Sequence, residues 1–128
     1  MDNYLKIIFA GTPEFSVPTL IALNTDYSKV IHVLTQPDKK SGRGMKNSYS
    51  PVKKTALRLN IPILQPISLK DNDAFEILEA SNADILIVAA YGLIIPSNIL
   101  ALFPMGCYNV HASLLPRWRG ADPIHRAI

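Results

Sequence analysis

The stretch ILIVAA, residues 85–90, is apolar throughout, and three of its side chains are β-branched. A strand with one face in water would alternate apolar and polar residues, so this run predicts a strand that is buried on both faces. Further strands are expected at residues 5–10 (LKIIFA), 30–34 (VIHVL) and 106–110 (GCYNV), with at most a short one at 63–64. Strands of this kind are typical of a parallel sheet that helices cover on both sides.

Helical patterns fill the intervals between these strands. Thr12 can cap a helix whose first residue is Pro13, although Pro18 should kink that helix or delay its start to about Ser16. Further helices are expected from about residue 51, over residues 71–81 and near residues 98–103. The side chains expected to face the sheet are Phe15, Leu20 and Leu23, then Val52, Ala56, Leu57 and Leu59, then Phe75, Ile77 and Leu78. Because strands alternate with helices, we expect a doubly wound, mostly parallel α/β sheet with right-handed crossovers.

Length and composition restrict the class of protein. The chain has 128 residues, 48% of them hydrophobic and 18% charged, which is one domain's worth and not a disordered composition. Its apolar runs are too short to span a bilayer, and the N-terminus lacks the pattern of a signal peptide. Cys107 is the only cysteine, so an internal disulfide is impossible and a reducing, cytoplasmic location is favoured. The net charge of +3 weakly favours an acidic partner.

Gly11 follows the first predicted strand, in FAGTPEF at residues 9–15. A glycine at this place can precede a phosphate site at a helix N-terminus. The dinucleotide-binding pattern, however, needs the spacing Gly-x-Gly-x-x-Gly, and Pro13 fills a position that needs a free N–H. We therefore interpret the segment as a tight turn into the helix.

The segment QPDKKSGRGMKNSYS, residues 36–50, has no hydrophobic periodicity. Asp38 is the only acid among its basic residues, which are Lys39, Lys40, Arg43 and Lys46. Gly42 and Gly44 free the backbone, so the segment could reach out and become ordered on contact with phosphates. The charge pattern alone equally allows a solvated surface loop without a partner.

Asn109 and His111 stand two residues apart at the end of the last predicted strand. Side chains at this spacing point to the same side, with Cα atoms about 6.5 Å apart, and the carboxyl end of such a strand faces the ligand crevice. Histidine can move a proton near neutral pH, and an amide N–H suits a developing oxyanion. The pair indicates either a catalytic centre or polar residues satisfied by nearby backbone. His32 and His125 look structural, and no Cys or His spacing resembles a metal site.

A known family shares the motif that contains this pair. NVHASLLPRWRGADPI, residues 109–124, resembles the active-site segment of enzymes that transfer formyl groups from 10-formyltetrahydrofolate. Three other segments resemble the members of that family that formylate methionyl-tRNA: KIIFAGTPEFSVPTL at 6–20, TQPDKKSGRGMKNSYSPVK at 35–53 and AAYGLIIP at 89–96. The likeness runs from about residue 6 to the end and implies a Rossmann-like formyltransferase fold.

The resemblance implies a role for several residues. Asn109 and His111 match the catalytic pair of the family. The residues that match the folate-binding segments are Ser113, Leu114, Leu115 and Pro116, together with Tyr91, Gly92, Leu93 and Ile94. The basic segment matches an insertion that touches the tRNA acceptor end, with Arg43 the first candidate for contact and Lys39, Lys40 and Lys46 beside it. The implied partners are initiator methionyl-tRNA and 10-formyltetrahydrofolate as the formyl donor, with no metal and no membrane, and we expect a monomer.

The resemblance also implies that residues 1–128 are the N-terminal part of the catalytic domain. The family's catalytic aspartate would lie in a later segment and its C-terminal domain later still, so we expect the 128 residues alone to be inactive. Residues 122–128 are expected to begin a helix. Two other functions remain open: a related folate-dependent formyltransferase acting on a small nucleotide, and a non-catalytic α/β domain that binds RNA.

Overall fold

The computed structural model describes residues 3–41, 46–111 and 121–123. Its main sheet has the strand order β5-β2-β1-β6-β7-β8. The strands are β1 (Leu5–Gly11), β2 (Ser28–Leu34), β5 (Ile63–Leu64), β6 (Ile85–Ala89), β7 (Cys107–Val110) and β8 (Ala121–Pro123). All neighbouring pairs are parallel except β7 with β8. The doubly wound, mostly parallel sheet predicted from the sequence is therefore confirmed.

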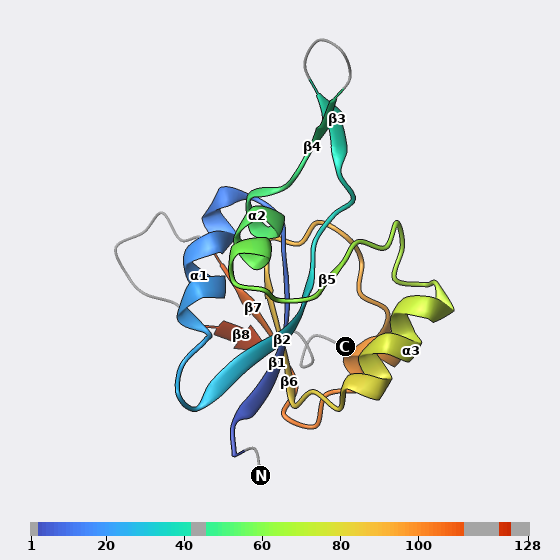
Figure 1. Cartoon of the computed structure of the whole chain (residues 1–128). Helices are drawn as coiled ribbons and strands as arrows, with labels where there is room; N and C mark the ends of the chain where they lie inside the picture. Colours follow the sequence, from blue (N-terminus) through green and yellow to red (C-terminus); the bar gives the residue numbers. More distant parts are fainter. Residues whose placement is uncertain (1–2, 42–45, 112–120, 124–128) are drawn as a thin grey trace.

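The central strand β1 is buried on both faces, as its apolar sequence predicts. Ile8 and Ala10 belong to the hydrophobic core on one side of the sheet, and Ile7 and Phe9 belong to the core on the other. Figure 1 shows helices α1 (Val17–Ala22) and α2 (Pro51–Arg58) on one side of the sheet and α3 (Asn72–Ser81) on the other. Each face of the sheet is thus sealed by helices, which is why these strands carry apolar residues at consecutive positions.

The first helix begins later than a cap at Thr12 would allow. A single 3₁₀ turn at Glu14–Ser16 precedes α1 (Val17–Ala22), and Pro18 lies in the first turn of α1, where a missing N–H does no harm. The delay caused by Pro18 is confirmed, whereas the predicted capping role of Thr12 is wrong. Phe15 is 40% exposed, so its predicted inward orientation is also wrong. The Thr12 hydroxyl instead donates to the carbonyl of Tyr91, 2.8 Å away.

Helix α2 (Pro51–Arg58) begins as the sequence predicts but turns a different stripe to the core. The Ser50 hydroxyl caps it by accepting from the Lys53 N–H at 3.0 Å. The fully buried apolar residues are Val52 and Ala56. Leu57 and Leu59 are 50% and 42% exposed, so their predicted inward orientation is wrong. Leu57 falls off the stripe that the helical repeat defines through Val52 and Ala56, whereas Leu59 lies beyond the last residue of α2, as its C-cap.

Of the two helices on the other face, α3 matches its predicted range to within one residue, and α4 is shorter than predicted. Helix α3 spans Asn72–Ser81 and ends at Asn82, which adopts the left-handed conformation with φ of 53°. Leu78 is buried there, but Ile77 is 40% exposed, against the prediction. Helix α4 spans only Ser97–Leu100.

The basic segment contains a hairpin that its sequence does not reveal. Strand β3 (Lys39–Ser41) pairs antiparallel with β4 (Lys46–Ser48), with Lys40 opposite Asn47. Figure 1 shows the hairpin projecting away from the main sheet. Backbone hydrogen bonds hold the two strands together. Because this pairing needs no apolar side chains, the sequence of the hairpin shows no alternation of apolar and polar residues.

Residues 121–123 do not begin the helix predicted for 122–128. They form β8, which pairs antiparallel with β7 and places Asp122 opposite Asn109. Pairing satisfies the N–H and C=O groups of β7 on a side that would otherwise be an open edge. Residues 124–128 lie outside the described part. Within the part of the chain described, no helix combines the length and the apolar character that crossing a membrane requires.

Candidate active site

The candidate site lies at the edge of the sheet where the parallel strands end. The strand order runs from β1 through β2 to β5 on one side and from β6 to β7 on the other, so the direction of winding switches between β1 and β6. Ligands of open α/β sheets bind outside the carboxyl ends of the strands at such a switch point. Thr12 follows β1, Tyr91 follows β6 soon after its end, and His111 follows β7.

Asn109 and His111 meet at this edge. The Asn109 amide nitrogen lies 3.4 Å from His111 Nε2, which confirms that their side chains share one side of the strand. Asn109 stands beside Val88 of β6 in the sheet register and is half-buried, whereas His111 is exposed. An amide donor fixed by the strand and an imidazole open to water can act on one reacting group and still exchange protons with solvent.

The segment after β6 makes two unusual backbone turns. Ala90 has a φ of 56° and Gly92 a φ of 93°, and both values lie in the left-handed region. A side chain at Gly92 would also collide with the Gln36 amide, so this position requires glycine. The turns expose the Tyr91 carbonyl, which accepts from Thr12 Oγ1 at 2.8 Å and from Gln36 Nε2 at 3.0 Å. The loops after β1, β2 and β6 are therefore tied together.

Tyr91 itself points its ring into the core. It is 1% exposed, its hydroxyl is buried with no hydrogen-bond partner among the described residues, and burial raises its pKa to about 12. Gly92, Leu93 and Ile94 instead line a pocket of about 320 Å³ together with residues 67–70. Ile94 is 80% exposed. An exposed apolar wall of this kind suits a flat heterocycle, with Tyr91 contributing backbone and packing.

Some of the residues singled out in the sequence lie outside the described part, namely Arg43, Ser113, Leu114, Leu115 and Pro116. Lys39 and Lys40 are exposed on β3. Lys46 is the first residue of β4. The hairpin thus carries its described lysines on two adjacent strands at the edge of the molecule.

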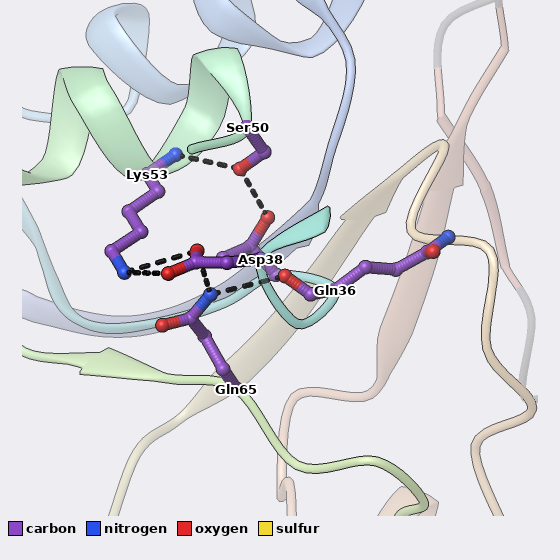
Figure 2. Close-up of polar contacts among 6 residues, drawn as sticks. Gln36, Asp38, Ser50, Lys53 and Gln65 are labelled. Atoms are coloured by element: carbon purple, nitrogen blue, oxygen red, sulfur yellow. Dashed lines mark hydrogen bonds and ion pairs between the residues drawn. The ribbon is translucent and has the colours of Figure 1, made fainter. Parts of the chain in front are cut away.

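A polar network at the root of the hairpin was not predicted. Figure 2 shows Lys53 of α2 and Gln65 after β5 converging on Asp38. Lys53 Nζ lies 3.0 and 2.9 Å from the two carboxylate oxygens, and Gln65 Nε2 donates to Asp38 Oδ1 at 2.8 Å and to the Gln36 carbonyl at 3.2 Å. The hydrogen bonds from Gln65 and from Lys53 hold the pKa of Asp38 below its ordinary value.

The same network continues into the cap of α2. The Ser50 hydroxyl lies 2.8 Å from Thr35 Oγ1, at the end of β2. Lys53 Nζ also lies 3.9 Å from the centre of the Tyr49 ring, a cation–π contact. The start of the hairpin and the start of α2 are therefore held as one unit. In the sequence, the network was indicated only by Asp38, an isolated acid in a basic segment.

Two titratable groups whose pKa values are shifted by burial lie away from the candidate site. His32 of β2 has a buried Nδ1 without a partner in the described part, and burial lowers its pKa. Cys107 is buried on β7, and burial raises its pKa to about 11. Among the residues that the structure describes, no group of three His, Cys, Asp or Glu side chains lies together as metal ligands would.

Residues 5–128 match the family model described as "Formyl transferase", and the chain therefore belongs to the formyl transferase family. It is similar to the methionyl-tRNA formyltransferase of Coxiella burnetii (strain RSA 493 / Nine Mile phase I), at 60% identity over 124 residues, with 97% of this chain and 40% of that protein covered. The methionyl-tRNA formyltransferase of Hydrogenovibrio crunogenus is 56% identical over 128 residues, covering 100% and 41%. The chain thus spans about 40% of the length of these relatives.

Solved structures with low sequence identity share the fold. Glycinamide ribonucleotide transformylase 1 from Geobacillus kaustophilus aligns with a TM-score of 0.60 at 23% identity, covering 98% of this chain and 67% of that one. Phosphoribosylglycinamide formyltransferase from Bacillus halodurans aligns with a TM-score of 0.56 at 18% identity, covering 95% and 63%. Both alignments support the α/β architecture described above.

Proposed function

We propose that this chain forms part of an enzyme that transfers a formyl group from 10-formyltetrahydrofolate to the amino group of methionyl-tRNA. Residues 1–128 would be the N-terminal part of its catalytic domain. The observation that carries the proposal is the contact of Asn109 with His111, 3.4 Å apart, at the carboxyl edge of the sheet. It occurs in a chain that is 60% identical over 124 residues to a methionyl-tRNA formyltransferase.

The reaction would proceed by direct transfer. The amine nitrogen of the methionyl group attacks the formyl carbon, and the formyl oxygen takes up the electron pair of its double bond. The Asn109 amide N–H stabilises that oxyanion. When the oxyanion collapses, the bond from carbon to folate N10 breaks, and His111 carries the proton that the amine loses to the leaving nitrogen. Neither a metal nor a covalent bond to the protein is needed.

The folate side of the reaction would use the exposed apolar wall after β6. Gly92, Leu93 and Ile94 line one pocket. They follow β6 at the carboxyl edge of the sheet, the same edge at which Asn109 lies on β7. We place the pterin ring against this wall, and we place Ser113 to Pro116 against the folate as the second segment. Pockets for flat heterocycles combine such apolar walls with a few polar groups that fix orientation.

The RNA side would use the hairpin. Lys39, Lys40 and Lys46 stand on its two strands, and Arg43 lies between them in the sequence. Lysine and arginine side chains on a projecting ribbon suit the phosphates of an RNA acceptor end. A small nucleotide acceptor has no need of such a projection, which favours tRNA over that alternative. We expect the enzyme to act as a cytoplasmic monomer.

The test is a transfer assay on the intact protein with 10-formyltetrahydrofolate, using methionyl-tRNA and glycinamide ribonucleotide as separate acceptors. Formylation of methionyl-tRNA alone is the expected result. Formylation of the small nucleotide instead would support the related enzyme. Binding of tRNA without binding of the folate, measured by calorimetry, would support a non-catalytic RNA-binding domain.

A further inference from the structure

A second pocket lies between the root of the hairpin and the carboxyl ends of β1 and β2. Its volume is about 200 Å³. The lining residues that matter for its chemistry are Thr12, Gln36, Lys39, Ser48, Tyr49 and Ser50. The pocket thus combines an aromatic ring, an amide, hydroxyl groups and one cation, and none of its lining residues belongs to the apolar folate wall.

The Tyr49 ring is the feature that points to a flat ligand. It is 43% exposed although it lines the pocket. The Lys53 ammonium lies 3.9 Å from the centre of the ring, and the Asp38 carboxylate holds that ammonium at 2.9 Å. The ring is therefore positioned by the protein before any ligand arrives. Since the ammonium occupies one face, a flat ligand would stack on the other.

The polar groups around the ring suit the edge of a nucleobase and a phosphate. The Gln36 amide nitrogen donates to the Tyr91 carbonyl, and the amide oxygen of the same side chain is an acceptor that suits a base amino group. Ser48 and Lys39 are both exposed. Lys39 supplies a cation for a phosphate, which an aromatic or aliphatic ligand without charge would not use.

The position of the pocket connects it to the candidate active site. Thr12 and Gln36 line the pocket, and both donate to the Tyr91 carbonyl, at 2.8 and 3.0 Å. A nucleotide held in the pocket would therefore lie beside the switch point of the sheet. An amino acid esterified to that nucleotide could extend along the sheet edge on which Asn109 stands.

We propose that this pocket binds the 3′-terminal nucleotide of the acceptor RNA, with its base stacked on Tyr49 and its phosphate near Lys39. Single-stranded RNA ends are typically bound in this way, by stacking on aromatic rings and by hydrogen bonds to base edges. The proposal rests on the proposed function, because it takes methionyl-tRNA as the acceptor.

The direct test uses the intact protein and a short RNA with fluorescent 2-aminopurine as its 3′-terminal base. Stacking on Tyr49 should quench the fluorescence on binding. Tyr49→Leu should abolish the quenching and weaken binding by about 5-fold to 100-fold, the range expected for one base stacked on one ring. Tyr49→Phe should keep both the quenching and the affinity, since the aromatic ring is retained. Tyr27→Leu is the matched control, because Tyr27 is 79% exposed and does not line the pocket.

Steady-state kinetics separate this proposal from the proposed function. Tyr49→Leu should raise the KM for methionyl-tRNA by a similar factor and leave the KM for the folate unchanged. If the wild type formylates methionyl-tRNA and Tyr49→Leu changes neither the quenching nor that KM, the pocket proposal is overturned and formyl transfer stands. If the wild type quenches but transfers no formyl group, the pocket proposal is supported and the proposed function fails. Should Tyr49→Leu not fold, Lys39→Gln tests the phosphate contact, and its loss of affinity should shrink as salt rises.

Discussion

The Lys53 ammonium lies 3.0 and 2.9 Å from the two oxygens of the Asp38 carboxylate, so both oxygens take part in one ion pair. This pair joins the residue just before the hairpin to the first turn of α2. Because Lys53 also lies over the Tyr49 ring, the pair connects the hairpin root to the proposed nucleotide pocket. The Lys53 and Asp38 side chains are only 13% and 21% exposed, and a part-buried pair of this kind can fix the position of a side chain that binds a ligand.

Replacing Asp38 with Asn should therefore raise the KM for methionyl-tRNA several-fold, since Lys53 loses its charged partner and Tyr49 its fixed support. The KM for the folate should not change. Steady-state kinetics with each substrate varied in turn would measure this. Glu79→Gln removes a negative charge from an exposed position on α3 and should leave both KM values unchanged.

The effect of Asp38→Asn should also depend on pH in a defined way. Gln65 and Lys53 hold the pKa of Asp38 below its ordinary value of 3.8. A carboxyl whose folded pKa is lowered keeps its interactions above its unfolded pKa and loses them as pH falls through the folded value. The difference between wild type and variant should thus persist from pH 3.8 to neutral pH. A difference that vanished near neutral pH would show that the carboxylate is not the group responsible.

Arg43→Ala should weaken the use of methionyl-tRNA without changing folate affinity, because the proposed contact of Arg43 with a phosphate would be lost. The loss should shrink as ionic strength rises, since salt screens such contacts. Kinetics at low and high salt provide the measurement. Arg58→Ala, at an exposed position in the last turn of α2, removes the same charge away from the hairpin. Equal effects of the two variants would mean that net charge matters and that the hairpin does not.

The elements that the sequence predicts well are those in which consecutive apolar residues indicate burial on both faces. Strands β1 and β6 are apolar at consecutive positions, and the structure buries them between two helical layers. The delay of α1 followed from Pro18, which can stand only near a helix start. Asn109 and His111 could be paired because a spacing of two residues fixes a common side on any strand.

The features that could not be predicted depend on contacts between distant polar groups. The hairpin is held by backbone pairing between β3 and β4, whose side chains are polar. Asp38 is separated from Lys53 by 15 positions and from Gln65 by 27, and no local rule connects such residues. The Tyr91 carbonyl becomes an acceptor for two loops only because Ala90 and Gly92 take left-handed backbone conformations, which no hydrophobic pattern encodes.

Tyr91→Phe should raise the free energy of unfolding by about 1 kcal/mol or leave it unchanged, because the variant removes a buried hydroxyl that has no partner in the described part. The ring and the backbone carbonyl, which accepts from Thr12 and Gln36, are kept. Urea unfolding of both proteins would measure the change. Tyr27→Phe, at an exposed position, should have no effect. A clear destabilisation by Tyr91→Phe would mean that the hydroxyl is hydrogen-bonded after all.

His32 should make the folded state sensitive to mild acid. Burial lowers its pKa below the ordinary value of 6.5, so below 6.5 the unfolded chain binds a proton that the folded chain does not. Stability should then fall as pH decreases from 6.5 toward the folded pKa. Urea midpoints of the wild type and of His32→Val, measured on both sides of 6.5, would test this. The variant should lose less stability than the wild type, and an equal loss in both would assign the effect to other groups.

Asn109 and His111, the proposed catalytic pair, give the most direct test of the proposed function. In the intact enzyme, His111→Ala should lower kcat by about 100-fold or more, the range for a lost acid–base group. Asn109→Ala should lower kcat by about 100-fold to 1,000-fold, the range for a lost oxyanion donor. Both KM values should change little, because the two side chains act on the transition state more than on the bound substrates.

A matched control distinguishes chemistry from packing in this experiment. Asn98 is exposed on α4, so Asn98→Ala removes the same amide from a place outside the candidate site and should keep full kcat. The double variant Asn109→Ala with His111→Ala should lose less than the product of the single losses, since the 3.4 Å contact makes the two side chains one unit. Near-wild-type kcat in either single variant, with the fold intact by thermal melting, would remove that residue from the mechanism.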